Sequence, residues 1–335
     1  MNKSKSFSER DYIFVVKAFA LLSIVAAHVA TVPQNSPPWN VLLGYILSSI
    51  GSIGVGVFFL LSGYLYFRTT KTFCQFFYSK IRTILIPWFF CGTFLFLYVV
   101  LRKGGLNFYN WFTTLTVFSH LYYLTVLMIF YLLFWKLRNN ICFLIFFSCL
   151  SIISITLTGQ EILDIYPYIN PLNWALYFIL GLLIRKYDLL EKLALFCKKW
   201  LVMISCVYVI ILIIYLSWGI YISYWKHAAI IAELFAIALV LGLSSYCSGM
   251  KKTNWFVYLG KMSFSIYLLH TPFAGIITNL FNHFHLWYFT LFRPLIVILM
   301  TLLGIEIVRY LSKKIKVNKI ADILLGVYKT DRSRT

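Results

Sequence analysis

Charged residues are scarce in this chain, and acidic residues are the scarcest of them. Charged side chains make up 12% of its 335 residues, with 10 Asp and Glu against 30 Lys and Arg. Soluble domains average about 25% charged residues, so the composition excludes an ordinary soluble fold. The 7 cysteines follow no C-x-x-C spacing, and His283 and His285 form only an isolated H-x-H pair. These patterns predict inert packing cysteines and no metal site.

Long apolar segments take the place of the missing charge. Hydrophobic residues make up 61% of the chain. Because about 20 mostly apolar residues cross a bilayer as a helix, we predict an all-α polytopic membrane protein with about ten transmembrane helices. Residues 1–335 form one integral-membrane domain in this interpretation, with a basic cytoplasmic tail over 310–335. The predicted spans are 12–32, 41–67, 83–101, 112–135, 141–158, 171–184, 200–219, 227–246, 255–280 and 288–309.

The net charge is +20. The positions of the basic residues follow the predicted membrane topology, which argues against a nucleic-acid-binding patch. With a cytoplasmic N-terminus, every Lys and Arg except Arg102, Lys103, Lys226 and Arg293 falls on the cytoplasmic side, as the positive-inside rule requires. Both termini are therefore predicted to be cytoplasmic. Most of these cations are expected to set topology and to contact anionic membrane lipids, and we expect no nucleic-acid partner.

Two ionisable residues interrupt the first predicted span. Lys17 and His28 stand within the apolar segment KAFALLSIVAAH, and ionisable groups in spanning helices usually face a bundle interior or a watery cavity on a functional pathway. A helix returns His28 to within about 20° of Lys17, roughly 16 Å away along the axis. One helix face therefore presents a cation in the inner half and an imidazole in the outer half.

Four cations crowd the predicted cytoplasmic connection between the second and third spans. They are Arg68, Lys71, Lys80 and Arg82. Arg and Lys are the usual partners of phosphate groups, so the cluster suits a polyphosphate ligand. Lipid anchoring explains any single one of these residues equally well.

The second span is rich in small residues, as its segment GSIGVGVFFLLSGYLYF shows. Small residues allow helices to approach closely in lipid. Tight helix packing is the first interpretation of this pattern, and a slot for a narrow ligand is the second.

The ninth span carries three polar residues on one helix face. Ser263, Tyr267 and His270 fall at positions i, i+4 and i+7, a spacing that places side chains on the same side of a helix. The predicted topology puts His270 at the same depth as His28. The sequence leaves open whether His270 acts in chemistry or is a structural hydrogen-bonding residue.

Other spans contain isolated candidates. His120 opens the fourth span near the predicted outer surface, where an interfacial aromatic belt accounts for Tyr122 and Tyr123. Glu233 lies within the eighth span and Glu306 near the inner end of the tenth. Intramembrane carboxylates are functional candidates, although each is also explained by neutralisation or by pairing with a cation.

Taken in order, these segments resemble the acyltransferase 3 family of bacterial inner-membrane acyltransferases. The resemblance rests on Lys17-x10-His28, on GVGVFFLLSGYL, on FYSKIRTILIPW, and on HLYYL with SFSIYLLHTP. The family often has two arginines three apart before the third span, whereas this chain has Lys80-Ile81-Arg82. No H-x4-D motif, which marks another class of acyltransferases, follows any of the 6 histidines. We expect a stand-alone membrane form without the fused hydrolase-like domain of some members.

The resemblance implies a membrane-bound O-acyltransferase of the bacterial cytoplasmic (inner) membrane. In that family an acyl-CoA, commonly acetyl-CoA, approaches from the cytoplasm, and its acyl group reaches a hydroxyl of a glycan or another acceptor on the outer side. His28 would be the catalytic histidine, while Lys17, Lys80, Arg82 and Arg68 would bind or orient the CoA. Imidazole suits this role because it exchanges protons near neutral pH. The donor is a substrate, and no tightly bound cofactor is implied.

A different class of protein also fits part of this pattern. A transporter or exporter of a polysaccharide or lipid-linked glycan would use buried His, Lys and Glu residues in a many-helix bundle. The absence of repeat symmetry and the Lys17-x10-His28 pattern favour the enzyme. The acceptor is either a surface polysaccharide or its lipid-linked precursor in this hypothesis, and the family also includes succinyl donors and acceptors other than sugars. The sequence does not fix the oligomeric state.

Overall fold

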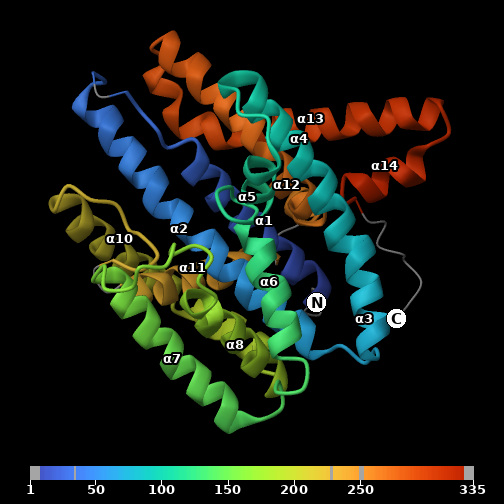
Figure 1. Ribbon diagram of the computed structural model, residues 1–335. Coiled ribbons are helices and arrows are strands. Elements are labelled where there is room, and N and C mark those ends of the chain that lie inside the picture. The colour runs from blue at the N-terminus through green and yellow to red at the C-terminus, as the bar shows by residue number, and fades with distance from the viewer. Residues whose placement is uncertain (1–7, 34, 227–228, 249–252, 328–335) are drawn as a thin grey trace, which may run out of the picture.

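The computed structural model describes residues 8–33, 35–226, 229–248 and 253–327 (Figure 1). These ranges contain no strand, so the predicted all-α class is confirmed. The helices are α1 (Glu9–His28), α2 (Pro38–Phe67), α3 (Phe73–Lys80), the π-helical η1 (Ile81–Leu85), α4 (Ile86–Lys103), α5 (Phe108–Thr116), α6 (Tyr122–Leu133), α7 (Ile141–Gly159), α8 (Leu172–Lys186), α9 (Leu190–Lys199), α10 (Leu201–Ser217), α11 (Ala229–Ser248), α12 (Asn254–His283), the 3-10 helix η2 (Trp287–Phe292), α13 (Arg293–Lys314) and α14 (Asn318–Leu324).

The helices confirm a multi-pass membrane protein. In the described ranges, 7 helical segments are long and apolar enough to cross a bilayer, and the pair α9 and α10, bent by 75°, brings the number to 8 if it forms one span. Three further helices that overlap predicted spans are shorter, namely α5 with 9 residues, α6 with 12 and α8 with 15. Every predicted span overlaps a helix, but the count of about ten spans stays a prediction.

The predicted fourth span is wrong as one continuous helix. Over residues 112–135 the chain instead forms the end of α5, a turn over 117–121, and α6. Ser119 satisfies part of the interrupted backbone because its hydroxyl accepts from the Leu121 amide at 3.1 Å and donates to the Thr114 carbonyl at 2.6 Å. Such local side-chain hydrogen bonds compete with helix continuation. His120 therefore lies on a turn between two helices.

Glycines hold α1, α2, α8 and α12 close together. A Cβ on Gly54 of α2 would collide with the Ala20 carbonyl of α1, and one on Gly260 of α12 would collide with the Phe14 carbonyl. Gly63 of α2 and Gly181 of α8 each lie against the backbone of the other helix. The small residues of the second span therefore serve close helix packing, as the first interpretation held.

Helix ends gather at two opposite faces of the bundle. At one face the Glu9 carboxylate lies 3.8 Å from the Arg68 guanidinium and 3.5 Å from that of Arg185, which joins the start of α1 to the ends of α2 and α8. At the other face Thr290 donates to the Asn40 side chain at 2.7 Å, which joins η2 to the start of α2. Successive helix ends therefore lie at opposite faces, which agrees with the predicted topology. The assignment of one face to the cytoplasm stays a prediction.

The segment after α13 is not a simple basic tail. Figure 1 shows α14 folded back below α13 toward α4, where the Cys91 thiol lies 3.5 Å from the Leu324 carbonyl. Leu325 and Val327 are buried. Residues 310–327 of the predicted tail therefore complete α13 and dock on the bundle through apolar side chains, while the cytoplasmic location of this segment stays a prediction. Residues 328–335 lie outside the described ranges.

Ion pairs secure this C-terminal fold. The Arg309 guanidinium donates to Asp322 of α14 at 2.9 Å and to Glu306 at 2.8 Å. Of the two explanations for Glu306 that the sequence left open, the structure supports pairing with a nearby cation.

Candidate active site

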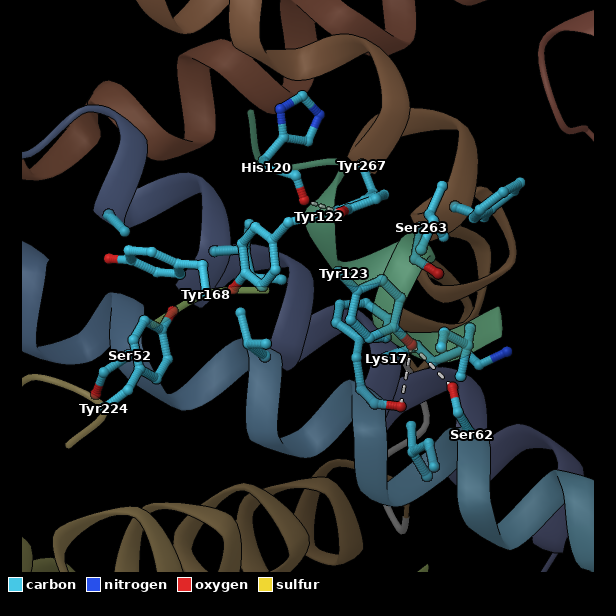
Figure 2. A pocket seen from close by; sticks show the side chains of 18 of the residues that line it. Lys17, Ser52, Ser62, His120, Tyr122, Tyr123, Tyr168, Tyr224, Ser263 and Tyr267 are labelled. Carbon is cyan, nitrogen blue, oxygen red and sulfur yellow. Dashed lines mark hydrogen bonds between the residues drawn. The ribbon is translucent and has the colours of Figure 1, made fainter. Parts of the chain in front are cut away.

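A cavity of about 1050 Å³ penetrates the bundle. Its walls come from α1, α2, α6 and α12, from the end of α3 with η1, and from loops that follow α7 and α10. Figure 2 shows Lys17 at one end of this space and Tyr168 and Tyr224 at the other, with Tyr122, Tyr123 and Tyr267 between them. The cavity therefore has two chemically different ends.

Three lysines, Lys17, Lys80 and Lys261, line what we call the lysine end. The Lys17 and Lys261 ammonium groups lie 5.8 Å and 5.6 Å from the centre of the same Phe14 ring. Lys80 is close enough to Lys17 for the two charges to repel. No carboxylate in the described ranges forms an ion pair with any of the three. Uncompensated cations in a partly enclosed space attract an anionic ligand.

Three imidazoles meet at the far end of α1. The ring centres of His28 and His270 are 4.9 Å apart, those of His120 and His270 are 4.8 Å apart, and those of His28 and His120 are 5.8 Å apart. The predicted equal depth of His28 and His270 is confirmed. No group of three metal-ligating side chains in the described chain is arranged to hold a metal ion. Imidazoles at these separations influence one another's charge and can exchange protons with a bound molecule.

Hydrogen bonds orient two of these rings. His270 Nδ1 lies 2.8 Å from the Tyr267 carbonyl, an acceptor, so Nδ1 carries the hydrogen and Nε2 is left with a lone pair. His120 Nδ1 lies 2.9 Å from the Thr271 hydroxyl, and the Tyr267 hydroxyl donates to the His120 carbonyl. The Nε2 atoms of both rings are buried without a protein partner among the described residues.

Access to the cavity distinguishes the three histidines. His270 is 0% exposed and lies outside the cavity lining, His120 lines the cavity but is 8% exposed, and His28 lines the cavity and is exposed. His28 is therefore the most accessible imidazole of the three, and His120 forms part of the cavity wall. The other two lie close enough to influence its charge and orientation.

Tyrosines line the middle of the cavity. Tyr122 and Tyr123 are 7% and 8% exposed, and both line the cavity. The Tyr123 hydroxyl lies 2.8 Å from Ser62 and donates to the Phe58 carbonyl at 3.3 Å. The prediction that an interfacial belt accounts for Tyr122 and Tyr123 is wrong, because the break before α6 turns these side chains inward.

Five more tyrosines form what we call the tyrosine end: Tyr45, Tyr166, Tyr168, Tyr221 and Tyr224. They come from α2, from the loop over 160–171, and from the loop that begins at residue 218. The two loops are joined by an ion pair between Glu161 and Lys226 at 2.8 Å. This end is aromatic and carries hydroxyl groups, in contrast to the lysine end.

A family profile described as an acyltransferase domain matches residues 10–309. That range includes every candidate site residue named above. The chain belongs to the acyltransferase 3 family. The predicted resemblance is confirmed, and the chain is a membrane acyltransferase. No curated protein and no solved structure matched it.

Not every predicted donor-binding residue of the acyltransferase lines the cavity. Lys80, Thr83 and Ile84 share the helix face that lines it, while Arg82 is exposed and lies outside the lining. Arg68 is also outside and lies near Glu9. The spacing within the helix explains the difference, because Arg82 is two positions from Lys80 and points elsewhere.

Lys261 is a cavity residue of the acyltransferase that the sequence analysis missed. It stands in the segment LGKMSFS, inside the predicted span 255–280, so the rule that singled out Lys17 also applies to it. Its neighbours Ser263 and Tyr267 line the cavity as well. His270 stands behind them, outside the lining.

Glu233 does not belong to the acyltransferase site. It is 2% exposed, packs against Gly56 and lies outside the cavity lining. Its Oε1 has no hydrogen-bond partner among the residues that the structure describes. A buried carboxyl without a cation nearby favours the neutral interpretation.

Arg293 supports the end of the helix that carries His28. Its guanidinium is 0% exposed and donates to the Thr31 carbonyl at 3.1 Å and to the Asn282 side chain at 2.7 Å. A longer contact of 3.5 Å reaches the Val29 carbonyl. A cation at this position complements the C-terminal end of the α1 dipole and fixes the backbone that follows His28.

Proposed function

We propose that this acyltransferase transfers an acetyl group from acetyl-CoA to a hydroxyl of a surface polysaccharide or its lipid-linked precursor. The observation that carries this proposal is the position of His28, an accessible imidazole in a cavity with three lysines at one end and hydroxyl-bearing aromatic rings at the other. We further propose that the protein lies in the bacterial cytoplasmic membrane, with the lysine end of its cavity toward the cytoplasm.

The lysine end suits the donor. CoA carries phosphate groups joined to a long, narrow arm that ends in the thioester. Lys17, Lys80 and Lys261 would bind these phosphates as point charges, and they have no carboxylate competitor in the described ranges. The arm would then extend along α1 toward His28, a helical distance of roughly 16 Å.

His28 would act as the general base. Its ring nitrogen removes the proton from the acceptor hydroxyl, and the hydroxyl oxygen attacks the thioester carbonyl. An ester C–O bond forms, the C–S bond breaks, and the CoA thiolate leaves and takes the proton from the His28 imidazolium. The reaction therefore needs no co-reactant beyond acyl-CoA and the acceptor.

His270 would support this base from outside the cavity lining, and His120 would support it from the cavity wall. The Nδ1–H of His270 is committed to the Tyr267 carbonyl, so its Nε2 lone pair is available near His28 when that ring becomes charged. Both rings are held by hydrogen bonds while His28 remains accessible. We therefore propose positioning roles for His270 and His120 and the catalytic role for His28.

The test is mass spectrometry of surface polysaccharides from cells that express the wild-type chain, the His28→Ala variant or neither. The acetyl mass gain is expected only with wild type, because loss of a general base lowers the rate by about a hundred-fold or more. His283→Ala is the matched control, since His283 is exposed and outside the cavity. It should retain the mass gain.

Insertion of each variant is verified from the amount of protein in the membrane fraction. A correctly inserted His28→Ala variant that still acetylates would contradict the catalytic assignment. Glycan that reaches the surface only in expressing cells, and without any mass gain, would instead support an exporter.

A further inference from the structure

We infer that the tyrosine end is a binding subsite for a neutral sugar ring, held by stacking on tyrosine faces and by hydrogen bonds from tyrosine hydroxyls. The inference rests on the proposed function only in treating this ring as part of the acceptor. Its physical basis is the geometry, the charge and the unused hydrogen-bonding capacity of this end of the cavity.

The aromatic rings form two kinds of surface. Tyr45 and Tyr221 are nearly parallel, with ring centres 6.4 Å apart and an angle of 25°. Tyr168 is nearly perpendicular to Tyr224, with centres 6.0 Å apart and an angle of 80°. One face of a sugar ring carries C–H groups and can lie flat on an aromatic ring, while its edge hydroxyls meet neighbouring polar groups. Rings at right angles supply both contacts.

The tyrosine hydroxyls at this end form no hydrogen bond with the described residues. Elsewhere the hydroxyls of Tyr12, Tyr66 and Tyr123 bond to backbone carbonyls, as buried tyrosines usually do. In contrast, the described residues provide no hydrogen-bond partner for the hydroxyls of the five tyrosines that define the tyrosine end. None of these five hydroxyls is fully buried without a partner. Their hydroxyls therefore remain available to a ligand rich in hydroxyl groups.

The described residues of the tyrosine end carry no net charge. Lys226 is its only charged lining side chain in the part of the chain that the structure describes, and it pairs with Glu161. The Lys226 ammonium lowers the pKa of the Glu161 carboxyl below its ordinary value by a direct hydrogen bond, so the pair stays charged and balanced. An anionic sugar would find no free cation here, which favours a neutral ring.

The two loops are held in place before any ligand binds. The Trp174 indole donates to the Tyr168 carbonyl at 2.9 Å, and the Tyr215 hydroxyl donates to the Lys226 carbonyl at 3.1 Å. Gly159 at the end of α7 lies directly against the Trp225 backbone. Rigid placement lowers the entropy lost on binding, so these contacts fit a preformed subsite.

The subsite opens toward the histidines. The Tyr122 and Tyr168 ring centres are 5.0 Å apart, and Figure 2 shows Tyr122 between Tyr168 and His120. An interfacial aromatic belt would direct its rings to the lipid boundary, whereas these rings line the cavity that also contains His28. A sugar stacked at this end can therefore present a hydroxyl toward His28.

The experiment measures glycan binding by the purified full-length chain in lipid nanodiscs, using the His28→Ala background to prevent turnover. An array of neutral and anionic oligosaccharides identifies the glycan, and titration gives its Kd. Tyr168→Ala and Tyr221→Ala are expected to weaken binding of a neutral glycan at least tenfold, and Tyr168→Phe less. Tyr109→Ala is the matched control, because Tyr109 is exposed and outside the cavity.

The outcomes separate this inference from the proposed reaction. Equal Kd values for all variants, a preference for anionic glycans, or no glycan binding would overturn the subsite. Tyrosine-dependent binding without acyl transfer by the wild-type chain would leave the subsite standing and reject the proposed reaction. If the chain transfers an acyl group to a glycan and Tyr168→Ala leaves the KM for that acceptor unchanged, the proposed reaction stands and the subsite is rejected.

Discussion

His28 is the only member of its histidine cluster that meets the cavity with an exposed ring. His120 and His270 are fixed by hydrogen bonds through Nδ1. A base that must reach a hydroxyl needs freedom to rotate, and neighbours that orient it need the opposite. In the proposed reaction, the cluster would divide these two requirements among three residues of the same type.

Lys261 gives a prediction for donor binding. We expect Lys261→Gln to raise the KM for acyl-CoA about tenfold, the effect of losing about 1.4 kcal/mol of charge-assisted binding. The turnover number should change less, because Lys261 lies far from His28 on the lysine end. Steady-state kinetics in proteoliposomes measure both constants.

Lys313→Gln is the control for this substitution, since Lys313 is exposed near the end of α13 and outside the cavity. A KM that rises equally in both variants would indicate a general effect of surface charge. An unchanged KM in Lys261→Gln would remove Lys261 from the donor site.

At the level of single residues, sequence reasoning found part of the cavity lining and missed Lys261 and the whole tyrosine end. An ionisable group inside an apolar segment needs a polar neighbourhood, and this rule pointed to Lys17 and His28, which line the cavity, and to His270, which lies beside His28. It could not exclude Glu233, because sequence does not show which helix lies opposite a side chain. It also could not separate Lys80 from Arg82, whose different directions depend on where the helix of α3 and η1 faces the bundle.

At the scale of the helices, the packing of α1 on α12 brings Lys17 and Lys261 to the Phe14 ring. Gly260 permits this contact because any side chain there would collide with the Phe14 carbonyl. We expect Gly260→Ala to destabilise the protein by about 1–3 kcal/mol, as overpacking does, and to raise the KM for acyl-CoA. Thermal denaturation in detergent and donor kinetics measure the two effects.

Gly275→Ala is the matched control on the same helix. A Cβ there would lie 3.3 Å from the Tyr98 hydroxyl, the end of a flexible side chain. This variant should remain close to wild type in stability. Similar melting temperatures for both variants would show that the α1 and α12 contact tolerates a methyl group.

The fourth predicted span shows why one element was misjudged. The residues between α5 and α6 read VFSHL, without proline or glycine to mark a break. Hydropathy therefore favoured one helix across 112–135. The turn depends on local bonding by Ser119 and on the contact of the His120 carbonyl with Tyr267 from a distant helix. A contact across so many residues leaves no local pattern.

At the scale of the whole molecule, the C-terminal segment closes part of the structure around the cavity. Gly326 belongs to the cavity lining and lies against Phe264 and Pro87. We expect Asp322→Asn to release α14, because it weakens the ion pair with Arg309. A half-buried pair contributes about 1 kcal/mol, so amide exchange over residues 318–327 should accelerate roughly fivefold.

Hydrogen-exchange mass spectrometry of the purified chain tests this prediction. Lys319→Gln is the control in the same segment, since Lys319 is exposed and forms no ion pair with the described residues. Exchange that is equal in wild type and Asp322→Asn would show that apolar contacts alone hold α14.

The order of motifs along the chain predicted the family and the membrane-spanning, all-helical architecture, which are properties of the whole molecule. Hydropathy and charge placement carry these features because each depends on many residues together. The docking of α14 was not predictable in the same way. Its basic, short segment reads as a solvated tail, and only its contacts with α4 show otherwise.

The uncompensated lysines also bear on how the empty protein behaves. Three positive charges without carboxylate partners in the described ranges repel one another inside a low-dielectric bundle. An anion that binds among them relieves this repulsion and stabilises the folded state by mass action. If the proposed donor binds here, it is in this sense a structural component of the protein, and we expect an added anion such as CoA to slow unfolding during purification.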